Sequence, residues 1–152
     1  MTSINIGRVV TGGLVAGVVA NVVDFVTNNY VLAADWQAWA AAHNIDPAGF
    51  RSMPVAGAWV VVDFMFGLLL VWTYAAMRPR FGPGVQTAVF AGLVIYLAPT
   101  LVLAGFTMMG LLSTTLFVEG SCAAAVSTFG GAIVGAALYK EEAASIKPAY
   151  AR

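Results

Sequence analysis

Charge is scarce in this sequence. Only 9% of its 152 residues are charged, whereas 61% are hydrophobic. Soluble domains usually carry about 25% charged residues, so lipid must cover much of the surface of this chain. The net charge is zero, which argues against nucleic acid as a partner, because phosphate binding requires a basic patch. The composition therefore indicates an integral membrane protein.

Cysteine and histidine are nearly absent. Cys122 is the one cysteine and His43 the one histidine, which excludes an internal disulfide, a multi-cysteine metal site and a bis-histidine haem. The sequence also lacks a nucleophile elbow, a phosphate-binding loop and a His-Glu-x-x-His motif. The sequence therefore favours a non-enzymatic protein and predicts no cofactor, and a membrane enzyme or its cofactor-holding subunit is the weaker alternative.

What the sequence has instead is four long apolar stretches, at residues 9–30, 55–77, 85–106 and 111–139. A helix crosses a bilayer with about 20 apolar residues. The predicted fold class is therefore all-α, an integral membrane four-helix transmembrane bundle that forms a single domain. The fourth span has 29 residues and must tilt, kink or protrude.

The polar segments of the chain are an outer loop at 31–54 and a tail at 140–152. In the loop, Asp35 is placed to cap a short helix that runs to about His43. Trp36, Trp39 and His43 would share one side of it, as in a helix that lies on the membrane surface.

The basic residues predict the orientation of the chain. Arg51 falls on one side of the four-span topology. The other six basic residues all fall on the opposite side: Arg8, Arg78, Arg80, Lys140, Lys147 and Arg152. The positive-inside rule then places both termini and the tail in the cytoplasm, and the long loop outside.

Three of the spans carry one acidic residue each, namely Asp24, Asp63 and Glu119. With the predicted topology, all three lie roughly 9–12 Å below the outer membrane boundary. We therefore predict an intramembrane carboxylate cluster in the outer half of the bundle, completed by Asn28. The polar residues expected to join it are Thr100, Thr115 and Cys122.

No basic residue lies within a span, and three carboxylates in a low dielectric cannot all stay ionised without a cation. Protonated acids could hydrogen-bond between helices in a structural role, or bind a proton or cation in a functional one. Arg51 could also fold in from the loop, or the acids could contact a partner protein. Oxygen ligands suit a hard cation such as calcium, magnesium or manganese, but the sequence leaves the identity of any metal open.

Small residues mark the predicted helix contacts. Gly13 and Gly17 in the first span, and Gly131 and Gly135 in the fourth, form small-xxx-small pairs, which let helices approach closely. Both pairs lie in the inner half. We expect the first and fourth helices to pack there, either within one bundle or between protomers.

Two functions follow from these features. The leading prediction is a small polytopic membrane protein that acts as a subunit of a membrane complex or as a homo-oligomer. Its partners would be the lipid bilayer and either another copy or another membrane protein. The alternative, from a different class, is a proton- or cation-coupled small transporter or channel that uses the carboxylate cluster.

A short repeat suggests that the bundle arose from two duplicated helical hairpins. The segment Val22-Val23-Asp24-Phe25 of the first span recurs as Val61-Val62-Asp63-Phe64 in the second. Apolar spans produce such short echoes easily, so the repeat is weaker than the four-span pattern.

Further segments carry a resemblance to a known class of proteins. They are Gly7-Arg8-Val9-Val10, Asp24-Phe25-Val26, Ala34-Asp35-Trp36, the run from Tyr74 to Gly84, and Leu138-Tyr139-Lys140-Glu141. With them the chain resembles uncharacterised small bacterial four-helix inner-membrane proteins of the domain-of-unknown-function type. The resemblance implies a bacterial origin, the cytoplasmic (inner) membrane and four spans. It implies no activity and no functional residues.

Overall fold

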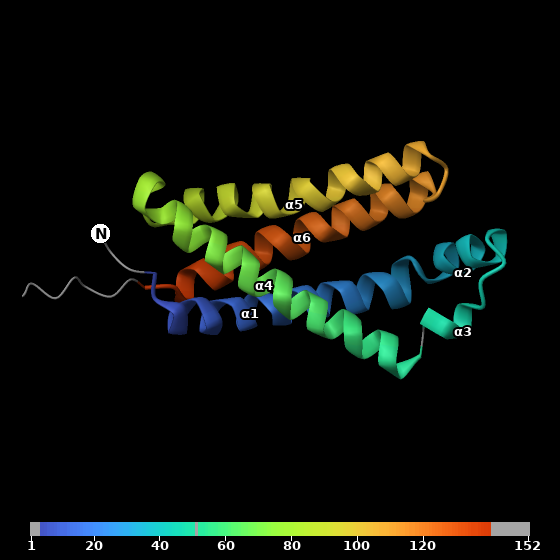
Figure 1. Cartoon of the computed structure of the whole chain (residues 1–152), viewed down its shortest axis with the longest axis horizontal. Helices are drawn as coiled ribbons and strands as arrows, with labels where there is room; N and C mark the ends of the chain where they lie inside the picture. The colour runs from blue at the N-terminus through green and yellow to red at the C-terminus, as the bar shows by residue number, and fades with distance from the viewer. Residues whose placement is uncertain (1–3, 51, 141–152) are drawn as a thin grey trace, which may run out of the picture.

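The computed structural model describes residues 4–50 and 52–140, and this part of the chain is helical without a strand (Figure 1). In chain order the elements are α1 (Ile6–Val26), the π-helical turn η1 (Thr27–Val31), α2 (Ala33–Ala42), α3 (Pro47–Phe50), α4 (Met53–Phe81), α5 (Val85–Met108) and α6 (Thr114–Leu138). Arg51 and the tail beyond Lys140, both used in the sequence analysis, lie outside the described residues.

Four helices are long and apolar enough to cross a membrane: α1 with η1, α4, α5 and α6. This confirms the predicted all-α, four-helix fold of a multi-pass membrane protein. The start of α1 and the end of α6 lie together at one end of the bundle, which we call the terminal end (Figure 1). The helices α2 and α3 lie at the opposite end, which we call the loop end.

The observed bounds differ from the predicted ones most clearly in α4 and α6. The sequence predicted a connection from Arg78, but α4 continues through Pro79 to Phe81. Proline holds a helical φ and here costs one hydrogen bond near the helix end. The fourth span starts at Thr114 rather than 111, because Ser113 caps α6 by accepting a hydrogen bond from the Leu116 amide (3.1 Å).

Helix α1 packs against α4 through glycines on both helices. A Cβ atom added to Gly13 would lie 2.7 Å from Cα of Leu68, and one added to Gly17 would lie 2.8 Å from Cα of Phe64. From the other side, a Cβ on Gly67 would collide with the backbone of Gly13 and Gly17. These distances are too short for any side chain, so the two helices touch backbone to backbone.

A second small-residue surface joins α1 to α6. A Cβ on Gly12 would lie 2.6 Å from the carbonyl oxygen of Gly135, and one on Gly131 would lie 3.5 Å from Cβ of Ala16. The predicted packing of the first and fourth spans is therefore present within one chain. The partners differ from the prediction, since Gly131 and Gly135 meet Gly12 and Ala16, whereas Gly13 and Gly17 face α4.

Two buried tyrosines close the terminal end. The rings of Tyr74 and Tyr139 meet edge to face with centroids 5.9 Å apart. The Tyr139 hydroxyl accepts a hydrogen bond from the Asn5 amide (3.3 Å), and the Tyr74 hydroxyl accepts one from the Gly84 amide (3.2 Å). The Arg78 guanidinium lies 5.4 Å from the centre of the Tyr139 ring. These contacts tie α4, α6 and both flanking segments together.

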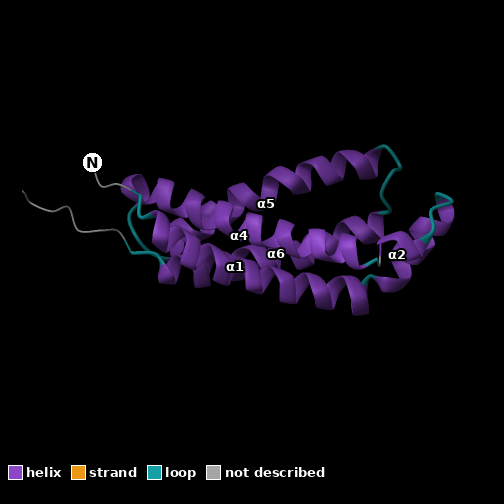
Figure 2. Ribbon diagram, turned by 60° about the horizontal axis from the view of Figure 1, so that its bottom comes forward, coloured by secondary structure: helices purple, strands orange, loops and turns teal. Residues whose placement is uncertain are grey.

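Helix α5 has buried residues only in its first two turns, although farther along the ring of Tyr96 contacts that of Phe129 in α6, with centroids 5.9 Å apart. Its buried residues are Thr87, Ala88, Ala91 and Gly92, and none follows Gly92. Toward the loop end α5 lies apart from the other long helices (Figure 2). The bundle is therefore tightly packed at the terminal end and looser at the loop end.

Replacing Gly67 by alanine tests the backbone contact between α1 and α4. Gly67→Ala should destabilise the protein by about 1–3 kcal/mol, because the new methyl group meets backbone that cannot move aside. Gly57→Ala in the same helix is the matched control, since its Cβ would meet nothing within 4 Å. Unfolding in mixed detergent micelles, followed by circular dichroism, measures both. Equal stability of the two variants would contradict the close contact.

Candidate functional site

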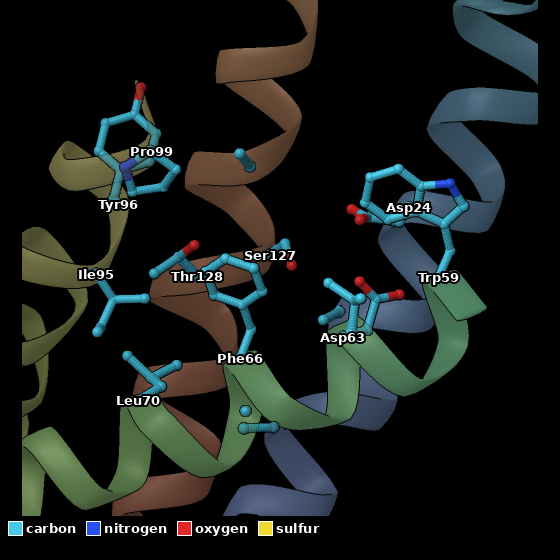
Figure 3. A pocket seen from close by; sticks show the side chains of 15 residues that line it. Asp24, Trp59, Asp63, Phe66, Leu70, Ile95, Tyr96, Pro99, Ser127 and Thr128 are labelled. Carbon is cyan, nitrogen blue, oxygen red and sulfur yellow. The ribbon is translucent and has the colours of Figure 1, made fainter. Parts of the chain in front are cut away.

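A cavity of about 180 Å³ lies in the middle of the bundle, where the four spans begin to diverge. Every long helix contributes to its wall (Figure 3). The polar or aromatic side chains that line it are Asp24 from α1, Trp59, Asp63 and Phe66 from α4, Tyr96 from α5, and Ser127 and Thr128 from α6. The rest of the wall is apolar or glycine, with Pro99 on the α5 side.

Two of the three predicted acids meet at this cavity. Asp63 is 8% exposed, and its carboxyl group is close enough to that of Asp24 for a hydrogen bond and a charge interaction. No lysine, arginine or histidine is among the described residues that line the cavity. A negative charge on either acid would therefore have no positive side chain among the described residues of the cavity wall to neutralise it.

The backbone around Asp24 departs from a regular α-helix. The Leu32 amide donates to the carbonyl of Thr27 (2.8 Å), which is the i→i+5 spacing of a π-turn. The Asn28 side chain donates from Nδ2 to the carbonyl of Asp24 (2.9 Å) and accepts at Oδ1 from Nε1 of Trp36 (2.9 Å). Asn28 thus links the backbone of Asp24 to α2, but it is exposed and does not line the cavity.

A residue that the sequence analysis passed over lies beside the acid pair. The Nδ2 group of Asn21 donates to the carbonyl of Gly17 in its own helix (2.9 Å) and, at 3.4 Å, to that of Val60 in α4. It links the two helices that carry the acids. Its position three residues before Asp24, in an otherwise apolar run, was the signal that could have identified it.

Ser127 supplies a hydroxyl group at the cavity from α6. Its side chain is 8% exposed, and within the described residues no hydrogen bond engages its hydroxyl. The Ser127 hydroxyl is therefore available to a water molecule or a ligand in the cavity.

Glu119 does not join the acid pair. It is exposed and absent from the cavity wall. Thr100, Thr115 and Cys122 are absent from that wall too. Steps of four residues lead from Glu119 through Ser127 to Gly135, as if these residues shared one helix face. Each such step turns the helix about 40° too far, so sixteen residues rotate by about 160°. Within the described chain, no three histidine, cysteine or acidic residues are grouped to hold a metal ion.

The loop end carries the predicted surface helix. Helix α2 covers Ala33–Ala42 and ends at His43, and the rings of Trp36, Trp39 and His43 lie in contact along one side. Nε1 of Trp39 donates to the carbonyl of Leu111 (2.8 Å) and so docks α2 on the connection between α5 and α6. Asp35 lies in the first turn rather than at the cap.

The chain matches no protein-family model, no curated protein and no solved structure. Its function must therefore be inferred from the geometry of the site.

Cysteine substitution tests whether water reaches the cavity. In a Cys122→Ala background, Thr128→Cys should react with a charged methanethiosulfonate reagent at least about ten times faster than Val126→Cys, because the nucleophile is the hydrated thiolate. Val126 is on the same helix and is 64% exposed, but on the outer surface of the bundle. Mass spectrometry gives both rates. Equal rates would contradict a hydrated cavity.

Proposed function

We propose that this protein is a small carrier of the bacterial cytoplasmic membrane that binds a proton or a cation at the Asp24–Asp63 pair. One observation carries the proposal: the Asp24 and Asp63 carboxyl groups lie close together beside a cavity that reaches all four spans, and no basic residue is among the described residues that line it. Acidic residues inside a membrane are costly and commonly mark ion or proton pathways.

The difference in packing between the two halves of the bundle supports a carrier. The terminal half is closed by glycine contacts and by Tyr74 and Tyr139, whereas the loop half is open around the acids. A site that is sealed toward one end and accessible from the other is what alternating access requires. Exchange would then need the terminal half to open while the loop half closes.

The direction of opening follows from the charges. Arg8, Arg78, Arg80 and Lys140 all lie at the terminal end of the bundle. By the positive-inside rule this end faces the cytoplasm. The cavity would then lie in the outer half of the membrane, which the resemblance to small inner-membrane proteins makes the periplasmic half.

The glycine faces favour the carrier over a role as a packing subunit. All four predicted glycines, Gly13, Gly17, Gly131 and Gly135, are occupied by helices of the same chain. These four glycines are therefore not available for self-association. The residues that supported the subunit hypothesis are used inside the bundle.

A liposome assay tests the carrier. Vesicles that contain the protein and a pH-sensitive dye should dissipate an imposed pH gradient faster than protein-free vesicles. Parallel samples test a sodium or potassium gradient with a dye for that ion. Asp63→Asn should reduce the rate to that of protein-free vesicles, because the amide cannot bind and release the ion. Glu119→Gln is the matched control and should retain the wild-type rate. Equal flux through wild type and Asp63→Asn would overturn the proposal.

One observation favours a second function, that of a subunit in a larger complex. Glu119 is exposed on α6, about 8 Å along the helix from Thr114, where a carboxyl group that faces lipid is unfavourable. A basic or hydroxyl group of a neighbouring protein would relieve it. Native mass spectrometry of the gently solubilised protein should then show a mass above that of one chain. The Glu119→Ala variant should show a lower mass, because the contact with the neighbouring protein is lost. A monomer in both samples would exclude the complex.

A further inference from the structure

The cavity is not confined to the centre of the bundle. Trp59 is 61% exposed and Phe66 is 43% exposed, yet both line the cavity. The wall formed by α4 therefore continues onto the outer surface of the bundle. The opposite wall is α5, whose residues are all at least partly exposed beyond Gly92.

The opening lies between α4 and α5. Figure 3 shows Tyr96 and Pro99 of α5 on one side of the site, Asp63 and Trp59 of α4 on the other, and Ser127 and Thr128 of α6 between them. Pro99 has no backbone amide, so the carbonyl of Ile95, which also lines the cavity, cannot accept its usual helical hydrogen bond. This gap faces the side of the bundle, where lipid would lie.

We propose that the ligand of this site is a small organic cation with an apolar body, which enters sideways from the membrane between α4 and α5. The inference rests on the proposed function and specifies its substrate class. Charge complementarity selects a cation, because the described residues of the cavity wall include two carboxyl groups and no basic side chain.

The remaining wall distinguishes an organic cation from a metal ion. Hard metal ions need about six oxygen ligands, and the described residues hold no group of three acidic, histidine or cysteine ligands. Aromatic rings instead bind ammonium groups through their π faces, and Trp59 lines the cavity beside the acids, with Phe66 and Tyr96 farther along its wall (Figure 3). The unpaired Ser127 hydroxyl can accept a hydrogen bond from an N–H donor or from a water molecule.

The size of the cavity limits the ligand. A cavity of about 150 Å³ holds a benzene molecule, so the space of about 180 Å³ here admits a ligand of one ring or a few short alkyl chains. Larger cations would have to extend into the gap between α4 and α5. Benzyltrimethylammonium combines one ring with a cationic head, so one of its two ends would extend into the gap, and it serves as the probe.

Binding of benzyltrimethylammonium to the full-length protein in lipid nanodiscs tests the inference. Wild type should bind the cation, measured by calorimetry, and should not bind neopentylbenzene, the uncharged molecule of the same shape. Trp59→Leu should weaken binding about tenfold by removing the ring. Trp72→Leu is the matched control, because Trp72 lies on the same helix, is exposed and does not line the cavity. It should bind like wild type.

The outcomes separate this inference from the carrier proposal. Trp72→Leu, which lies outside the cavity, should retain both the ion flux of the liposome assay and the binding, whereas Asp63→Asn should lose both. No binding to wild type, equal binding of the neutral molecule, or equal loss in Trp59→Leu and Trp72→Leu would overturn the organic cation. Each of these results leaves an Asp63-dependent flux standing as support for the carrier alone.

Discussion

The close approach of α1 to both α4 and α6 is the constraint on which the rest of the structure depends. Lipid tails are as apolar as leucine, so burial of apolar side chains gives helices in a membrane no reason to associate. Packing must supply the attraction, and it is strongest where the backbones touch. Helix α1 meets this requirement twice, with Gly13 and Gly17 against α4 and with Gly12 and Ala16 against α6.

The extent of these small-residue surfaces also explains where the bundle opens. On α1 the last glycine is Gly17, and beyond it come Asn21 and Asp24. On α5 the small residues Ala88, Ala91 and Gly92 are buried in the first turns, and none is buried after them. Larger side chains beyond these points hold the helices apart. The cavity is therefore a direct consequence of where the glycines end.

The acid pair sits at this boundary between packed and open structure. In the packed half a carboxyl group would have no water and no base. In the open half it has access to a cavity whose wall also offers the Ser127 hydroxyl. Two carboxyl groups in such a place cannot both carry charge unless a cation lies near them. This dependence on a proton or cation connects the packing of the bundle to its proposed role as a carrier.

Much of this arrangement could be predicted from residue spacing, and the failures have a physical cause. Asp24 follows Gly13 by eleven residues, which return to within about 20° of the same face. The helix contact at Gly13 therefore carries Asp24 toward α4 and Asp63. The same calculation explains the position of Glu119. It precedes Gly135 by sixteen residues, and the residual rotation of about 160° turns its side chain to the outer surface. A pattern of i+4 steps holds for two turns and then fails.

The sequence by itself determined the membrane environment, the four spans and the presence of acids within three of them. Composition and hydropathy decide these properties because they depend only on which residues tolerate lipid. Only the tertiary structure decided which acids meet, which glycines face each other, and that the gap lies between α4 and α5. These properties depend on the rotation and crossing of whole helices. The close backbone contacts at Gly12 and Gly67 set that rotation. Each contact involves two helices, so it cannot be read from the sequence of one span.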